Sequence, residues 1–138
     1  MIAQVFILFT FVLFSNQQTA NDIIEGYLKV VEPLKPDCIK ESGANPDFID
    51  KALKDGKFPD DKASQCFWKC FFKKLNLIND KEEVIEENIR QFIGVPDKKV
   101  ADEIFEKCIH LRGSDICESI NNIGMCVYTS AIAAAGKQ

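Results

Sequence analysis

The sequence predicts an all-α domain of six helices that is cross-linked by disulfide bonds. Beyond residue 20, apolar residues recur at steps of three and four, the spacing of one helix face. No stretch alternates apolar and polar residues over the length of a strand. Six cysteines in 138 residues indicate an oxidising compartment. The length suits one domain with a sizeable core and is too short for two.

Residues 1–20 hold thirteen apolar side chains and no charged one. The run Val5–Phe14, VFILFTFVLF, is about half as long as the roughly 20 residues that a membrane helix needs. A run of this length, followed by polar residues and Ala20, is typical of a secretory signal peptide. We therefore expect residues 1–20 to be a signal peptide cleaved at or near Ala20, and residues 21–138 to form one secreted, extracellular domain. A buried N-terminal helix or a lipid-surface anchor is the alternative.

All charged residues lie beyond residue 20, and their sum is a net charge of −4 with a pI of about 5.0. An acidic domain of this kind has nothing that attracts it to phosphate groups. We therefore expect no nucleic-acid partner and no binding to an anionic membrane surface.

Start and stop signals divide the chain into six expected helices. Pro33 and Pro36 are expected to interrupt the first. Asn45 is the expected N-cap of the second and Pro46 its first residue, while Asp60 or Asp61 caps the third. The expected ranges are 22–34, 46–56, 61–75, 80–93, 97–112 and 114–138.

The last expected helix begins with Ser114 as its cap and carries a regular apolar stripe. The stripe consists of Ile116, Ile120, Ile123, Val127 and Ala131. Its final six residues, AAAGKQ, are expected to fray.

Geometry restricts the pairing of the cysteines without deciding it. Cys66 and Cys70 lie four residues apart on one helix, with Cβ atoms about 5–6 Å apart, whereas a disulfide needs about 3.8 Å. Cys117 and Cys126 are separated by about 13 Å along a helix axis. Excluding these two pairs leaves most of the 15 possible pairings open. A simple hairpin of the last two helices favours Cys108 with Cys117.

The cysteine, histidine and acidic residues do not form a catalytic or metal-binding pattern. Zinc sites usually have C-x2-C pairs or several histidines, whereas this chain has a C-x3-C pair and one histidine, His110. The acidic run at Glu82, Glu83, Glu86 and Glu87 is expected to be a solvated helix face. We therefore expect no metal, no cofactor and no enzyme activity.

The cysteine spacing C-x27-C-x3-C-x37-C-x8-C-x8-C resembles that of the insect odorant-binding protein family in its six-cysteine form. The segments around the cysteines resemble the family as well, and the likeness extends from about Ile24 to Tyr128. These segments are CIKESG, KDGKFPDD, CFWKCFFKKLNLIND and GSDICE.

The resemblance implies six helices around an internal apolar cavity. It also implies the interlocked bonds Cys38–Cys70, Cys66–Cys117 and Cys108–Cys126. This pairing differs from the hairpin expectation, because it requires the last two helices to cross steeply.

The inner helix stripes supply the candidate residues of a ligand-binding wall. Tyr128 is a further candidate, able to offer its hydroxyl to a ligand, although a hydrogen bond within the core is the alternative. Phe71 and Phe72 point about 100° apart on their helix and are not expected to face the same space. The wall candidates are Val31, Phe72, Leu75, Phe92, Phe105, Ile109, Ile123 and Val127.

The expected function is that of a secreted carrier for a small hydrophobic molecule, such as an odorant, a pheromone or a related lipid. Aromatic residues follow both cysteines of the C-x3-C helix, which favours an apolar or aromatic ligand. The resemblance is also compatible with two further partners, which are a chemosensory membrane receptor and a second copy of the chain in a homodimer. The alternatives are a saposin-like lipid-interacting protein, a non-olfactory carrier of the same fold, and a structural or signalling protein whose interior is filled by side chains.

Overall fold

The computed structural model describes residues 19–136, and the expected signal peptide lies outside this range except for Thr19 and Ala20. Six helices and no strand occur in the described part, which confirms the all-α prediction. No described helix is both long enough and apolar enough to cross a membrane. The helices are α2 (Ala20–Ser42), α3 (Pro46–Asp55), α4 (Lys62–Lys74), α5 (Glu86–Phe92), α6 (Lys98–Cys108) and α7 (Ile116–Gly136).

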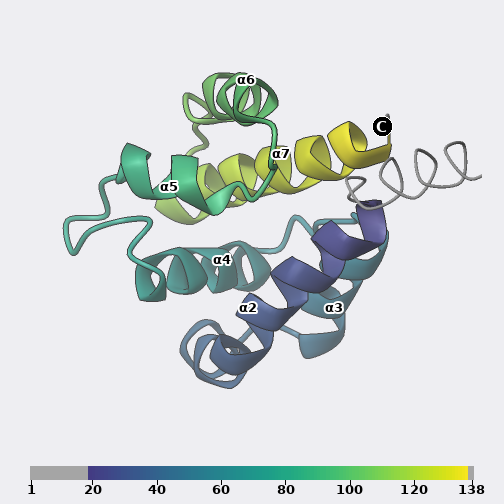
Figure 1. Ribbon diagram of the computed structural model, residues 1–138. Helices are drawn as coiled ribbons and strands as arrows, with labels where there is room; N and C mark the ends of the chain where they lie inside the picture. Colours follow the sequence, from purple (N-terminus) through teal and green to yellow (C-terminus); the bar gives the residue numbers. More distant parts are fainter. Residues whose placement is uncertain (1–18, 137–138) are drawn as a thin grey trace, which may run out of the picture.

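Helices α4 and α7 lie side by side at the centre of the molecule, and the other helices pack around them (Figure 1). The Cys66–Cys117 bond joins the two helices near their N-terminal ends, and further along each helix the Phe72 ring lies beside Gly124. Helix α6 crosses α7 steeply, as the resemblance implies.

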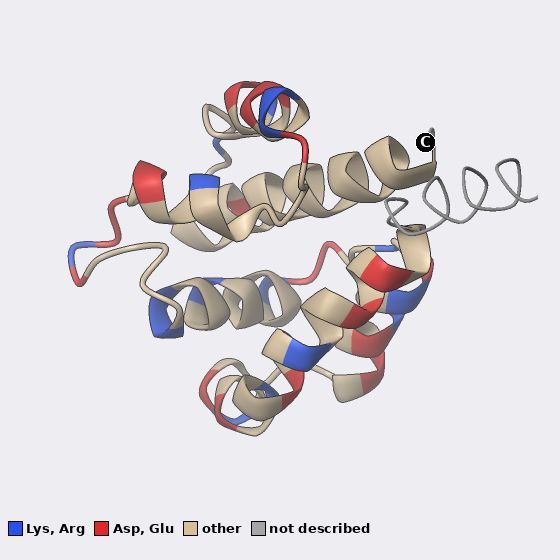
Figure 2. Ribbon diagram, viewed as in Figure 1, with Lys and Arg blue, Asp and Glu red and all other residues tan. Residues whose placement is uncertain are grey.

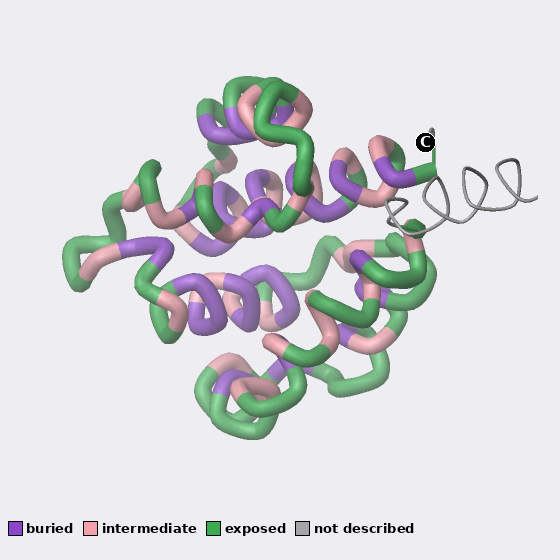
Figure 3. Tube along the Cα trace, in the orientation of Figure 1, coloured by how far each residue is buried: buried purple, intermediate pink, exposed green. Residues whose placement is uncertain are grey.

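Helix α7 is the most apolar element of the core. Glu118 is its only charged residue, and Figure 2 shows the helix almost uniformly uncharged. Buried positions occur along its whole length, including the expected stripe residues Ile120, Ile123 and Val127 (Figure 3). A helix that is apolar on most sides must be covered by neighbours, and α7 is covered by α2, α4 and α6.

Three disulfide bonds tie these helices together in an interlocked order. Cys38–Cys70 joins α2 to α4, Cys66–Cys117 joins α4 to the start of α7, and Cys108–Cys126 joins the end of α6 to the middle of α7. The structure thus has the pairing that the resemblance implies, and it lacks the Cys108–Cys117 bond of the hairpin expectation.

The expectation that Pro33 and Pro36 interrupt the first helix is wrong, since α2 continues to Ser42. Both prolines are exposed, so water can satisfy the carbonyl groups that their missing N–H groups leave free. The helix changes direction along its length, as proline-containing helices do (Figure 1). The fully buried Cys38 and its bond to Cys70 anchor the part beyond the prolines.

The expected helix start at Asp80 is also wrong, because residues 76–85 form a compact turn. The Asn79 side chain accepts hydrogen bonds from the N–H groups of Lys81 and Glu83. A single antiparallel bridge joins Ile78 to Val84. Asparagine side chains often stabilise turns of this kind in competition with a helix, and α5 therefore begins only at Glu86.

The last two helices also have ends that differ from the expected ones. Helix α6 ends at Cys108 rather than Arg112, and the Arg112 side chain donates to the Ile109 carbonyl in the turn that follows. The Asp115 carboxylate, not Ser114, accepts from the Glu118 N–H at the start of α7. Helix α7 continues through Gly136 with Ala135 buried, so residues 133–136 do not fray.

We predict that the stability lost on removing a disulfide follows the length of the loop it closes. The Cys66–Cys117 bond spans 51 residues and the Cys108–Cys126 bond spans 18. Replacing each pair with alanine should lower the free energy of unfolding by about 4 and about 3 kcal/mol, respectively. Denaturant unfolding of the two variants tests this, and a larger loss for the Cys108–Cys126 pair would contradict it.

Candidate functional site

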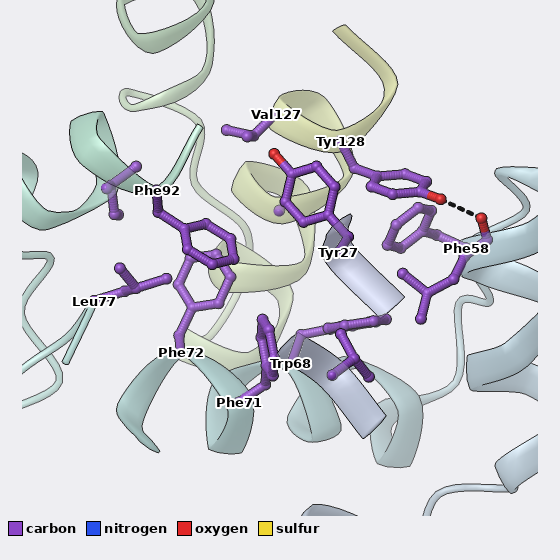
Figure 4. A pocket seen from close by; sticks show the side chains of 13 residues that line it. Tyr27, Phe58, Trp68, Phe71, Phe72, Leu77, Phe92, Val127 and Tyr128 are labelled. Atoms are coloured by element: carbon purple, nitrogen blue, oxygen red, sulfur yellow. Dashed lines mark hydrogen bonds between the residues drawn. The ribbon is translucent and has the colours of Figure 1, made fainter. Parts of the chain in front are cut away.

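A cavity lies between α2, α4, α5 and α7, with walls that are almost wholly apolar (Figure 4). Its volume is about 40 Å³. The residues around it are Tyr27, Val31, Leu53, Phe58, Trp68, Phe71, Phe72, Leu77, Ile89, Phe92, Gly124, Val127 and Tyr128.

The helical repeat explains why each helix contributes its particular residues. Tyr27 and Val31 are four residues apart on α2, and Ile89 and Phe92 are three apart on α5, so each pair faces one side. The same spacing of three or four residues occurs on the two central helices. On α4 it relates Trp68 to Phe71 and Phe72, and on α7 it relates Gly124 to Val127 and Tyr128. The remaining wall residues are Leu53 at the end of α3, Phe58 before α4 and Leu77 after α4.

Six aromatic side chains of the wall form a closed circuit of ring contacts, which we call the aromatic belt. Neighbouring ring centroids in the circuit are 5.2–6.1 Å apart, within the range of favourable aromatic pairs. Five of the six pairs are edge-to-face; the rings of Phe58 and Trp68 are tilted. In order, the belt is Tyr27, Tyr128, Phe58, Trp68, Phe71 and Phe92.

Both tyrosine hydroxyls of the belt donate to backbone carbonyl groups. The Tyr27 hydroxyl donates to the Ile93 carbonyl at 2.8 Å and so ties α2 to the end of α5. The Tyr128 hydroxyl donates to the Leu53 carbonyl and ties α7 to the end of α3. Burial raises the pKa of Tyr128 to about 12. Burial, with Tyr128 as a second cause, also raises the pKa of Tyr27 far above its usual value of 10.

Of the nine expected wall residues, five line the cavity and four do not. The cavity-lining five come from α2, α4, α5 and α7, and they are Val31, Phe72, Phe92, Val127 and Tyr128. Tyr128 takes the alternative role, since its hydroxyl is bonded within the core.

The other four expected residues lie outside the cavity lining. Leu75 caps the C-terminus of α4 and is half-buried. The Phe105 ring is buried beneath Arg90, whose guanidinium carbon lies 4.0 Å from the ring centroid. Ile109 and Ile123 belong to the closely packed core instead. Apolar spacing identified these residues as inward-facing, but it does not distinguish core from cavity wall.

The sequence-based reasoning missed eight lining residues, of which Phe71 was explicitly argued against. Phe71 and Phe72 both reach the cavity despite their different directions on α4, and their ring centroids are 6.4 Å apart. Long aromatic side chains can converge on a space between two helix faces. The repeat of aromatic residues at Trp68, Phe71 and Phe72, one turn apart, was the signal available in the sequence.

The charged residues singled out in the sequence lie on the surface. His110 is exposed at the end of α6, and the acidic residues Glu82, Glu83, Glu86 and Glu87 are all exposed. Within residues 19–136, no three histidine, cysteine or acidic side chains come together as a potential metal site.

Comparison with known proteins agrees with this architecture. Residues 21–130 match the model of the PBP/GOBP family. General odorant-binding protein 69a of Drosophila melanogaster is 27% identical over 110 residues, which cover 80% of this chain and 72% of that protein. Odorant-binding protein 10 of Aedes aegypti is 26% identical over 118 residues, covering 83% and 81%.

A solved structure shares the fold. Apis mellifera odorant binding protein 5 superimposes with a TM-score of 0.64 at 19% identity, over 88% of this chain and 96% of that one. With six helices, three disulfides and a family match over most of its length, the chain belongs to the PBP/GOBP family of insect odorant-binding proteins.

Proposed function

We propose that this protein is a secreted carrier that holds one small apolar or aromatic molecule in the cavity bounded by the aromatic belt. The observation that carries the proposal is the wall itself, which combines seven aromatic side chains with aliphatic ones and contains no charged residue. Transfer of an apolar molecule from water to such a surface is favourable by about 25 cal/mol per Å² of buried area.

Binding requires the wall to open. A cavity needs about 10–15 Å³ to hold one water molecule, so a cavity of 40 Å³ holds a few water-sized groups rather than a whole odorant. The side chains best placed to move are Tyr27 and Phe92. Both are only half-buried, and both also line a surface groove between α2 and α5. Their displacement connects the groove to the cavity.

The family and the interlocked disulfides support the odorant-carrier proposal over the saposin-like alternative, which is expected to have nested bonds. Removal of residues 1–20 as a signal peptide and transfer of the ligand to a membrane receptor are parts of the same proposal. The small volume of the cavity favours one competing function, that of a structural or signalling protein with a filled interior, and ligand titration separates the two.

We predict that residues 21–138, with the three disulfides formed, bind one equivalent of an apolar fluorescent dye. The ligand will quench Trp68, because this lone tryptophan lies in the cavity wall. Fluorescence titration gives the stoichiometry, and displacement by candidate odorants gives their relative affinities. Absence of saturable quenching with dyes of several sizes would contradict the carrier function and support the filled-interior alternative.

Gly124 gives a direct test of where the ligand lies. It is within α7, where alanine is more favourable than glycine by about 1 kcal/mol. A Cβ atom at this position meets only the Phe72 ring, at 3.5 and 3.6 Å, which is ordinary contact. A methyl group therefore fits the folded protein but occupies part of the cavity.

We predict that Gly124→Ala raises the free energy of unfolding by about 1 kcal/mol and weakens ligand binding about threefold to tenfold. Gly26→Ala is the matched control. Gly26 also lies within a helix, and nothing approaches its Cβ position within 4 Å. It lines the open surface groove rather than the cavity, so a methyl group there takes no space from a bound ligand. It should gain similar stability with unchanged affinity. Equal affinities for the two variants would show that the ligand does not lie beside Gly124.

We predict that ligand affinity changes less than about twofold between pH 5 and pH 8, because the two ionisable wall residues, Tyr27 and Tyr128, remain neutral there. Their pKa values are raised in the folded protein, so the native state retains protons that the unfolded state loses above pH 10. Stability and binding should therefore decline as the pH rises from 10 towards 12. Dye titrations across this range test the prediction, and a tenfold loss on going from pH 7 to pH 5 would refute it.

A further inference from the structure

One polar atom in the cavity wall has no hydrogen-bond partner. Trp68 is only 5% exposed, and no acceptor of the described residues reaches its indole Nε1. This nitrogen can only donate a hydrogen bond. Buried donors in folded proteins nearly always have a partner, because leaving one unpaired lowers stability.

The location of Trp68 distinguishes it from the other unpaired groups. Ser64, Gln65 and Asn121 also have a buried oxygen without a partner, but none of them lines the cavity. Trp68 does, and its ring lies between those of Phe58 and Phe71 in the aromatic belt. Among the residues with an unpaired buried polar atom, Trp68 is therefore the one whose side chain lines the cavity.

The hydroxyl groups of the other polar side chains of the wall already donate hydrogen bonds within the protein. Tyr27 donates to the Ile93 carbonyl and Tyr128 to the Leu53 carbonyl. The remaining lining residues are aliphatic side chains, phenylalanines and one glycine. Among the lining side chains, Trp68 is thus the donor left for a ligand.

We propose that Trp68 Nε1 donates a hydrogen bond to the ligand, and that the cavity therefore selects apolar molecules bearing one carbonyl oxygen, such as aromatic ketones, aldehydes and esters. This inference rests on the proposed carrier function. A carbonyl group satisfies the indole N–H, whereas a hydrocarbon of the same shape leaves it unpaired. Sites with a buried donor discriminate strongly against ligands that lack the matching group.

Acetophenone and α-methylstyrene provide a matched pair of probes, because they share one shape and differ in having C=O or C=CH2. Displacement of a fluorescent dye gives both affinities in the wild-type protein and in Trp68→Phe. The variant should lower the acetophenone-to-α-methylstyrene affinity ratio about tenfold. The cost of removing each ligand from water is the same in both proteins, so the change in ratio isolates the indole contact.

Phe72→Leu is the control. It removes an aromatic ring from the same part of the wall, but it removes neither a donor nor a ring in contact with Trp68, so it should leave the ratio unchanged. An unchanged ratio in a Trp68→Phe variant that binds both probes would overturn the inference. Failure of both probes to bind the wild-type protein saturably would instead overturn the carrier function.

A second measurement needs no variant. The chain has one tryptophan, so its NMR spectrum contains a single tryptophan indole N–H signal. Acetophenone should move this proton downfield relative to its position with α-methylstyrene, since the aromatic ring of the two ligands is the same and only the carbonyl accepts a strong hydrogen bond. Equal positions with both ligands bound would contradict the donor role of Trp68.

Discussion

The covalently linked contact between α4 and α7 is the constraint on which the rest of the structure depends. The Cys66–Cys117 bond fixes the register of the two helices near their N-terminal ends, and the exposed ion pair between Lys62 and Asp115 joins them at the same end. This register places Phe72 opposite Gly124 and brings Trp68 and Tyr128 to one cavity. The bond also explains how the molecule tolerates incomplete packing, because a covalent link restricts the unfolded chain and offsets the contacts that a void loses.

The aromatic belt makes the cavity wall both apolar and ordered. Aromatic side chains have two rotatable bonds, so they supply a large contact area at a low cost in conformational entropy. The hydroxyls of Tyr27 and Tyr128 restrict two members of the belt further, by binding carbonyl groups at the ends of α5 and α3. The short helices α3 and α5 are therefore positioned by the same residues that form the wall. A ligand that displaces Tyr27 affects the attachment of α5 as well.

The sequence was sufficient to predict the helical class, most helix starts and the cysteines that carry the fold. It failed where a local signal is outweighed by a tertiary contact or by a competing local turn. Pro33 and Pro36 disfavour a helix locally, but exposed prolines and the anchoring of Cys38 allow α2 to continue. Asp80 has the features of a helix start, yet the Asn79 side chain stabilises a turn that also includes the backbone bridge of Ile78 and Val84. The rule that proline ends a helix does not take the anchor at Cys38 into account. The rule for helix starts does not take the hydrogen bonds of the Asn79 side chain into account.

The cavity wall was only partly predictable for a related reason. Helical spacing identifies residues that face inward, but Phe105 and Ile123 face inward as much as Phe92 and Val127 do. Which of them meet protein and which meet open space depends on how the helices cross. Helix α6 contributes no residue to the cavity lining, and its Phe105 packs beneath Arg90. A glycine in the sequence is the local feature that indicates where the open space lies. Gly124 interrupts an apolar helix without a positive φ or a close backbone approach to require it, so the absence of a side chain there is explained by the space that it leaves between α4 and α7.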